Sequence, residues 1–142
     1  MNFRTSFTVD QSPDEVFRAV VDVPRWWTGE VDGTAAQLGD EFVYRYADLH
    51  YSRQKVTEVV PGRTVVWRVL DAKLSFTADP AEWTGTDLVF RISPQGLTFE
   101  HVGLVPAVEC YDQCSSAWGF FINGSLKRLI TTGEGPATPP WA

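Results

Sequence analysis

The sequence predicts an α+β fold in which a curved antiparallel sheet is wrapped around one long C-terminal helix. Three observations lead to this prediction. Apolar residues recur at every second position in several segments between residues 3 and 102, which is the spacing of strands with one buried face. The spacing changes to that of an amphipathic helix of about seven turns over residues 108–132. No other predicted element is long enough to cover the sheet.

The N-terminal segment predicts a strand and then short helices. Apolar and polar residues alternate over residues 3–9, as in a strand with one buried face. A helix start follows, in which Ser12 caps the helix, Pro13 occupies its first turn and Glu15 completes a capping box. Pro24 ends this helix, because proline breaks the helical hydrogen-bond ladder.

Trp26 and Trp27 follow in a turn or a second short helix. Because adjacent side chains point in different directions, we expect one Trp to pack inward and the other to lie near the surface. The chain has six Trp in 142 residues. Such aromatic richness suits a protein that holds an apolar ligand, and it also suits an ordinary aromatic core.

The middle of the chain predicts a run of about six strands in consecutive antiparallel hairpins. Turn residues such as Pro61-Gly62 and Ser93-Pro94-Gln95-Gly96 separate them, and residues 71–83 form a long connection. A sheet built in this way is curved, and a straight helix cannot touch it everywhere, so we expect a cavity between them. The clearest strands cover residues 42–46, 50–60, 65–69, 88–92 and 97–102.

The predicted helix over residues 108–132 has a mixed inner face. A helix that only fills a core is usually more apolar, so this helix can also form the wall of a cavity. An ordinary core helix is the alternative. Lys127 and Arg128 lie in its last turn and Gly133 provides a left-handed stop. The inner face comprises Cys110, Tyr111, Cys114, Ser115, Trp118, Phe121, Ile122, Ser125, Leu126 and Leu129.

Composition limits the class of protein. With 44% hydrophobic and 21% charged residues, the chain has the balance of a soluble globular protein. We expect residues 1–133 to form a single domain and residues 134–142 a Gly- and Pro-rich tail. A net charge of -6 without a basic cluster argues against binding to nucleic acid or an anionic membrane. No apolar run approaches 20 residues, so we expect no membrane span. A polar N-terminus and only two Cys predict a cytoplasmic protein.

The sequence contains no recognisable catalytic or metal motif. No serine lies in a nucleophile elbow, and the glycines form no phosphate loop. Cys110, Cys114 and His101 match no standard zinc spacing, so we expect neither a metal nor another cofactor. A disulfide between the two Cys within a helix would be strained.

Two histidines are candidate polar groups. His101 either offers a hydrogen bond inside an apolar cavity or is a structural His at the end of a strand. His50 shares its alternation with Ser52 and Gln54, and the sequence does not decide which side of that strand faces inward. Shared inward alternation of strand and helix predicts the following ligand-contacting residues: Phe42, Tyr44, Trp67, Phe90, Phe99, His101, Tyr111, Cys114, Trp118 and Ile122.

Short motifs in order along nearly the whole chain resemble one protein family. They are Val56-Thr57-Glu58-Val59-Val60-Pro61 with Val65-Val66-Trp67, Glu82-Trp83-Thr84-Gly85-Thr86 with Phe90, and Glu109-Cys110-Tyr111-Asp112-Gln113-Cys114 with Trp118. This order is similar to the activator of Hsp90 ATPase-like family of the START/Bet v1-like (SRPBCC) superfamily. The resemblance implies a helix-grip fold with a hydrophobic cavity between sheet and helix. Members of the family are similar to lipid carriers, to polyketide aromatase/cyclases and to a cochaperone domain.

Three functions follow as hypotheses. The first is binding or carrying of a small hydrophobic or aromatic molecule, which needs only the cavity. The alternative is a polyketide cyclase- or dehydratase-like enzyme that uses His101 and a Tyr as acid and base. An Hsp90 cochaperone-like interaction module is a weaker alternative. Phe120 falls on the polar side of the long helix, so we expect either the tail, which ends in Pro139-Pro140-Trp141, or a second copy in a homodimer to cover it.

Overall fold

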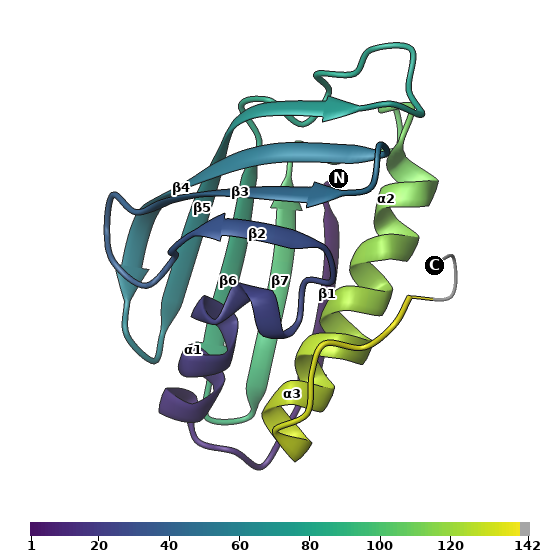
Figure 1. The fold of residues 1–142 in the computed structure, drawn as a ribbon. Helices are drawn as coiled ribbons and strands as arrows, with labels where there is room; N and C mark the ends of the chain where they lie inside the picture. Colours follow the sequence, from purple (N-terminus) through teal and green to yellow (C-terminus); the bar gives the residue numbers. More distant parts are fainter. Residues whose placement is uncertain (140–142) are drawn as a thin grey trace.

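A computed structural model describes residues 1–139. Its centre is a seven-stranded antiparallel sheet with strand order β1-β7-β6-β5-β4-β3-β2, drawn in Figure 1. Consecutive strands from β2 to β7 are neighbours, and β1 closes the other edge by pairing with β7. The strands are β1 (Phe3–Thr8), β2 (Glu30–Gly33), β3 (Glu41–Tyr46), β4 (His50–Val60), β5 (Thr64–Leu74), β6 (Asp87–Ser93) and β7 (Gly96–Val102).

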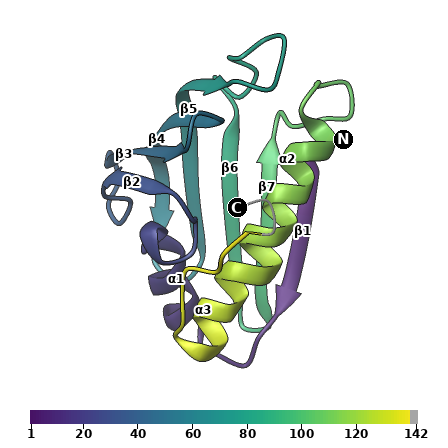
Figure 2. The ribbon, with the colours of Figure 1, turned by 45° about the vertical axis from the view of Figure 1, so that its right-hand side comes forward.

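The C-terminal helix is one continuous rod of three segments. Figure 2 shows it running alongside β1 and β7, while the sheet bends away toward β2 and β3. Its segments are α2 (Tyr111–Trp118), the π-helical η2 (Gly119–Leu126) and α3 (Lys127–Thr132). Gly133 ends it with a left-handed φ of 77°, as the sequence predicts. This sheet and helix form a helix-grip arrangement.

The long helix begins at Tyr111 and not at residue 108. The residues before it are held by side chains outside the helix. The Glu82 carboxylate accepts hydrogen bonds from the backbone N–H groups of Glu109 and Cys110, at 2.9 and 3.3 Å. The N–H groups just before a helix have no acceptor within the helix, and here the Glu82 carboxylate on the β5–β6 connection accepts them. The expectation of a helix from residue 108 is therefore wrong by three residues.

Two short helical elements connect β1 to β2. They are α1 (Pro13–Val21) and the 3₁₀ turn η1 (Val23–Arg25), and they cover the lower end of the core in Figure 1. The capping box at Ser12 forms, because the Ser12 hydroxyl accepts from the Glu15 N–H at 3.2 Å and the Glu15 carboxylate accepts from the Ser12 N–H at 3.3 Å. Val16 and Val20 are the buried residues of α1.

The core lies between the concave face of the sheet and the long helix, and it is mostly aromatic. Trp26 and Trp27 are 0% and 2% exposed, so the expectation that one of them lies near the surface is wrong. Trp26 donates its indole N–H to the Val20 carbonyl at 3.1 Å, and Trp27 stacks on Tyr44 with ring centroids 3.9 Å apart. The 3₁₀ turn ends at Arg25 and Trp26 caps it, so both rings enter the core directly after the turn.

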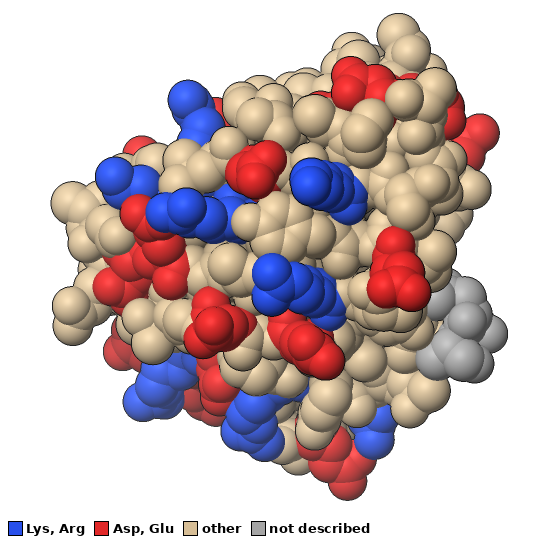
Figure 3. Space-filling view, turned by 45° about the horizontal axis from the view of Figure 1, so that its top comes forward, with Lys and Arg blue, Asp and Glu red and all other residues tan. Residues whose placement is uncertain are grey.

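The outer surface carries charges of both signs. Basic and acidic side chains are interspersed on the face shown in Figure 3. Arg53 and Arg68 pair with Glu41 and Asp87 on exposed positions of the strands, so these cations do not reach the core. No helix within residues 1–139 is long and apolar enough to cross a membrane.

Candidate functional site

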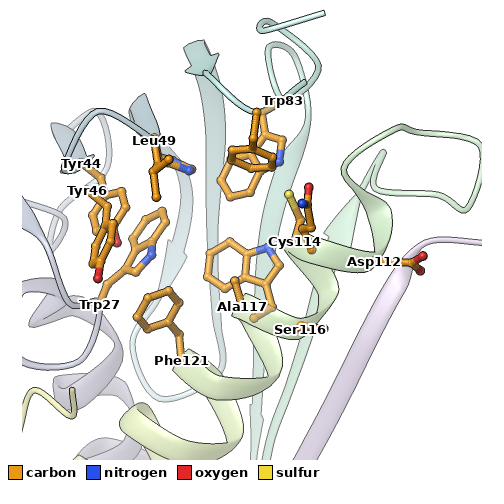
Figure 4. Close-up of a pocket in the computed structure, with 14 residues that line it drawn as sticks. Trp27, Tyr44, Tyr46, Leu49, Trp83, Asp112, Cys114, Ser116, Ala117 and Phe121 are labelled. Carbon is orange, nitrogen blue, oxygen red and sulfur yellow. The ribbon is translucent and has the colours of Figure 1, made fainter. Parts of the chain in front are cut away.

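A cavity of about 580 Å³ opens between α2, the β3–β4 hairpin and the connection from β5 to β6. Figure 4 shows Trp27, Tyr44 and Tyr46 on the sheet side of this cavity, with Cys114, Ala117 and Phe121 on the helix side. Its size is that of a site for a small organic molecule. The lining residues are Trp27, Tyr44, Tyr46, Leu49, His50, Phe76, Trp83, Asp112, Gln113, Cys114, Ser116, Ala117, Trp118 and Phe121.

Two stacked aromatic pairs belong to the wall of the cavity. Trp27 stacks on Tyr44 at 3.9 Å, and Trp83 stacks on Trp118 with centroids 5.6 Å apart and planes 13° apart. Trp27 and Trp118 join the pairs at 5.1 Å. Ring faces and edges provide a large apolar surface with few rotatable bonds. The wall is therefore suited to a flat apolar or aromatic molecule.

Tyr44 presents its ring to the cavity and not a free hydroxyl. Its hydroxyl donates to the Thr28 carbonyl at 2.5 Å. Burial, with a smaller contribution from Tyr46, raises the pKa of the Tyr44 phenol well above its usual value. The phenol therefore stays neutral at physiological pH, and its hydroxyl stays hydrogen-bonded to the Thr28 carbonyl.

His101 is fully buried and both of its ring nitrogens are used. Trp118 donates its indole N–H to Nδ1 at 3.0 Å. The Thr86 hydroxyl donates to the Trp83 carbonyl at 2.6 Å, so Thr86 Oγ1 accepts the Nε2 proton of His101 at 2.9 Å. Burial, with a smaller effect of His50, lowers the pKa of His101 to about 3. His101 is therefore a neutral connector between β7, the β5–β6 connection and the helix.

His50 is the accessible imidazole of the site. It is partly exposed and lines the cavity. Its ring packs edge to face with Tyr44 and Trp83, at centroid distances of 5.0 and 4.6 Å. Its Nε2 lies 2.8 Å from the Ser52 hydroxyl. Removal from water lowers the pKa of His50 to about 3, so this ring is also neutral at pH 7.

Cys110 and Cys114 lie side by side at the start of α2. Their Sγ atoms are 2.6 Å apart, and both thiols are free. The hydrogen bond from the Cys114 thiol lowers the pKa of Cys110, and the same contact together with burial raises the pKa of Cys114. Cys114 thus stays protonated where it lines the cavity. Within residues 1–139, no group of three or more His, Cys, Asp or Glu is placed to hold a metal ion.

Two glutamates attach the β5–β6 connection to the helix. Besides the hydrogen bonds that Glu82 accepts at the helix start, the Glu109 carboxylate accepts the Ala78 N–H at 3.0 and 3.1 Å. This connection carries Phe76 and Trp83, which line the cavity. The clamp formed by Glu82 and Glu109 therefore positions one wall of the site.

Comparison with known proteins identifies the fold. The sequence matches no protein-family model and no curated protein. The structure is similar to the Aha1 dimer from Colwellia psychrerythraea, with a TM-score of 0.73 and 24% identity, covering 95% of this chain and 99% of that one. It is also similar to protein MLL2253 from Mesorhizobium loti, with a TM-score of 0.73 and 19% identity, covering 92% and 96% of the two chains.

The fold is Aha1-like. It is the Bet v1-like helix-grip fold that the sequence motifs imply, and this expectation is confirmed. A third similar structure is DynU16, a protein in the dynemicin biosynthetic locus, with a TM-score of 0.65 and 19% identity. The match covers 94% of this chain and 48% of DynU16, so the chain spans about half the length of that protein. Identities this low show the fold alone.

Three of the ten residues predicted to contact a ligand line the cavity, and seven do not. The three are Tyr44, Cys114 and Trp118. Tyr111 is half-buried outside the lining, and His101 is fully buried. The other five are buried in the core and do not line the cavity: Phe42, Trp67, Phe90, Phe99 and Ile122. Trp67 and Phe90 pack together at 4.7 Å, so the aromatic rings fill the middle of the grip.

Sequence reasoning did not include most of the actual lining. The cavity lies at the end of the grip near the β3–β4 turn, where Tyr46, Leu49 and His50 meet the β5–β6 connection. Leu49 precedes β4, and Phe76 and Trp83 lie between strands, so strand alternation gives no information about them. One signal was present, because Trp83 belongs to a family-like motif, Glu82-Trp83-Thr84-Gly85-Thr86.

Proposed function

We propose that the protein binds, and carries, a small hydrophobic or aromatic molecule in the cavity between the sheet and α2. The observation that carries this proposal is the pair of stacked aromatic walls, Trp27 on Tyr44 and Trp83 on Trp118, around about 580 Å³ of space. The shared Bet v1-like fold, which commonly binds hydrophobic ligands, supports it. Asp112, Gln113 and Ser116 are exposed and leave the apolar interior accessible from solvent.

Binding of a neutral fluorescent probe tests this proposal. We expect N-phenyl-1-naphthylamine to bind the wild-type protein at micromolar concentration and to quench its Trp fluorescence. Ala117→Phe places a ring in the cavity, because Ala117 lines it, and should reduce the affinity at least tenfold. Ala107→Phe is the matched control, since Ala107 is exposed and does not line the cavity. Absence of probe binding to the wild type, or equal loss in both variants, would refute the proposal.

A retained natural ligand is the direct test. Native mass spectrometry of the protein purified from its own host should show a mass in excess of the 15.9 kDa chain, and Ala117→Phe should lose that excess mass. Extraction and tandem mass spectrometry of the released compound would then identify the ligand.

A cyclase- or dehydratase-like activity is the second candidate, and the likeness in fold to DynU16 favours it. The acid and base expected from the sequence do not support it. Both nitrogens of His101 are occupied, and the Tyr44 hydroxyl is bound to Thr28. His50 is the imidazole that lines the cavity, and its low pKa makes it a weak base. We therefore rank carrying above catalysis.

We also propose that the protein forms a homodimer. The support is the likeness to a structure described as the Aha1 dimer. An Hsp90 cochaperone-like interaction remains the weakest of the proposed functions, because it rests on likeness in fold alone.

A further inference from the structure

A row of three polar side chains on β4 leads to the apolar cavity. His50, Ser52 and Gln54 alternate along β4, and all three side chains point to the concave side. Ser52 and Gln54 are 0% exposed, which is unusual for polar residues that serve no structural turn. Only the last member, His50, reaches the cavity. Three buried polar groups in sequence are costly to place in an aromatic core unless each has a partner.

The hydrogen bonds along this line have a direction. The Gln54 amide nitrogen donates to Ser52 Oγ, while the Gln54 amide oxygen is buried without a hydrogen-bond partner among residues 1–139. Within residues 1–139, the Ser52 hydroxyl contacts one other side-chain acceptor, Nε2 of His50 at 2.8 Å. The hydroxyl proton therefore points to Nε2, and the neutral imidazole carries its own proton on Nδ1. The buried pair Gln54 and Ser52 thus selects one tautomer of His50.

Among residues 1–139, the hydrogen bond of the His50 ring is the one at Nε2, and no group of these residues accepts the proton of Nδ1. The ring is surrounded by aromatic groups, with Trp27, Tyr44 and Trp83 at centroid distances of 6.0, 5.0 and 4.6 Å. None of these three neighbours makes a hydrogen bond to this N–H. A ligand that fills the cavity displaces water from Nδ1–H, and it must supply an acceptor or leave the donor unpaired.

We propose that His50 is the specificity-determining polar anchor of the cavity, and that it donates its Nδ1–H to a carbonyl oxygen on the edge of a neutral, flat aromatic ligand. This inference rests on the proposed binding function and narrows it to aromatic ketones and quinones. The aromatic walls bind the ring system, and the His50 donor fixes its orientation. An uncharged donor in an aromatic surround suits a neutral carbonyl, because a carboxylate would be desolvated without a cation to pair with it.

A matched pair of ligands tests the anchor. Fluorenone and fluorene share one tricyclic ring system, and only fluorenone has a carbonyl oxygen. Affinities from Trp fluorescence quenching give the ratio of the two dissociation constants for the wild type and for His50→Leu. The ratio within each protein cancels the contribution of the shared rings. We expect the preference for fluorenone to be about 3- to 10-fold larger in the wild type, which is the contribution of one hydrogen bond. Tyr51→Phe is the control and should keep the wild-type ratio, because Tyr51 does not line the cavity and its ring packs against Arg45.

Nitrogen-15 NMR of the imidazole gives a second readout that needs no variant at His50. In the wild type, Nδ1 should have the shift of a protonated nitrogen and Nε2 that of an unprotonated one. Fluorenone should shift the Nδ1 signal and fluorene should not. Ser52→Ala should remove the tautomer preference.

The outcomes separate this inference from the proposed function. If neither ligand binds the wild type, the proposed function fails. If both ligands bind and the ratio is the same in the wild type and His50→Leu, the anchor is refuted while the binding function stands. A wild-type imidazole protonated on Nε2 would also refute it, and this result stays available if His50→Leu fails to fold.

Discussion

Trp118 belongs to both the core and the cavity wall. Its side chain is 1% exposed, it packs against Phe99 at 4.6 Å and Trp83 at 5.6 Å, and its N–H is bonded to His101. The same side chain is among the residues that line the cavity. The contacts on the core side are the ones that a truncation would remove.

We expect Trp118→Ala to lower the free energy of unfolding by about 3–5 kcal/mol, as for other buried aromatic residues. Trp118→Phe keeps one ring and removes the indole N–H with the rest of the indole, so its loss should be smaller than that of Trp118→Ala. Urea denaturation measures both variants. A Trp118→Ala change within error of zero would show that the ring does not pack in the core.

The buried His101 makes stability dependent on pH. Its folded-state pKa is about 3, whereas an unfolded His has a pKa near 6.5. Between these values the unfolded chain binds the extra proton, so stability is fully present above about pH 6.5 and falls as the pH decreases. The slope for one such His is at most about 1.4 kcal/mol per pH unit.

We expect the free energy of unfolding to fall from pH 6.5 to pH 5, a range that lies above the titration of most carboxylates. His101→Gln should reduce this slope. It should also cost about 1–3 kcal/mol at pH 7, because Trp118 and Thr86 lose their partner. Urea denaturation at both pH values provides the measurement, with Gln95→Ala at an exposed hairpin position as the control. A slope unchanged by His101→Gln would assign the pH dependence to other groups.

At the scale of elements, the wall carried by the β5–β6 connection depends on the clamp formed by Glu82 and Glu109. The contacts involve backbone N–H groups of Ala78, Glu109 and Cys110, so side-chain charge at two positions controls the placement of Phe76 and Trp83. Because the clamp is exposed, its loss should affect the local order of the connection more than global stability.

We expect Glu109→Ala to accelerate amide hydrogen exchange at Ala78 and to weaken binding of N-phenyl-1-naphthylamine, while the free energy of unfolding falls by about 1 kcal/mol or less. Glu134→Ala is the matched control, because Glu134 pairs with Arg128 on the exposed surface far along the helix. Unchanged exchange at Ala78 would mean that other contacts hold the connection.

The sequence predicted elements better than it predicted the cavity. Alternation located β4, β6 and β7, and helical spacing located the long helix, because each of these elements buries one face. The polar β2, Glu-Val-Asp-Gly, lacks such alternation and was not predicted. The same limit applies to the site. Inward-facing strand residues were predicted to contact a ligand. In the structure Trp67, Phe90 and Phe99, which lie between the sheet and the helix, pack against each other instead.

The orientation of β4 is the clearest case. Its polar residues His50, Ser52 and Gln54 and its charged residues Arg53 and Lys55 alternate, so hydrophobicity does not identify the inward face. Pairing decides it, because Ser52 lies opposite Tyr44 on β3 and opposite Ala72 on β5, both of which are buried. That information is tertiary, and a single sequence does not contain it.

At the scale of the whole molecule, the proposed homodimer predicts a measurable mass. Light scattering should give twice the 15.9 kDa mass of the chain. Phe120 is half-buried on the helix and meets Phe121 edge to face at 5.4 Å. If a second copy covers Phe120, Phe120→Ser should shift the mass toward the monomer, whereas Ala107→Ser should not. A monomer at all concentrations would refute the dimer. Trp141, the other residue expected to cover Phe120, lies outside the described residues.

The chain beyond α3 returns to the body of the protein. Arg25 donates to the Gly133 carbonyl at 2.7 Å, and the Thr28 hydroxyl donates to the Ala137 carbonyl at 2.5 Å. Thr28 in turn accepts the Tyr44 hydroxyl, and Pro139 is buried. The segment after α3 therefore supports the strand side of the cavity, because Thr28 is hydrogen-bonded both to Ala137 and to Tyr44.

We expect a chain that ends at Gly133 to lose about 1–3 kcal/mol of unfolding free energy, because it loses buried contacts and the bond to Thr28. It should also bind N-phenyl-1-naphthylamine more weakly, because Tyr44 loses part of its support. Thr28→Val removes the bond to Ala137 and keeps the Thr28 carbonyl that Tyr44 needs, so it should reproduce the loss of stability in part and leave probe binding closer to the wild type. Urea denaturation and probe titration of the three proteins separate these effects. Equal stability and equal affinity in all three would show that the segment after Gly133 contributes nothing to the cavity.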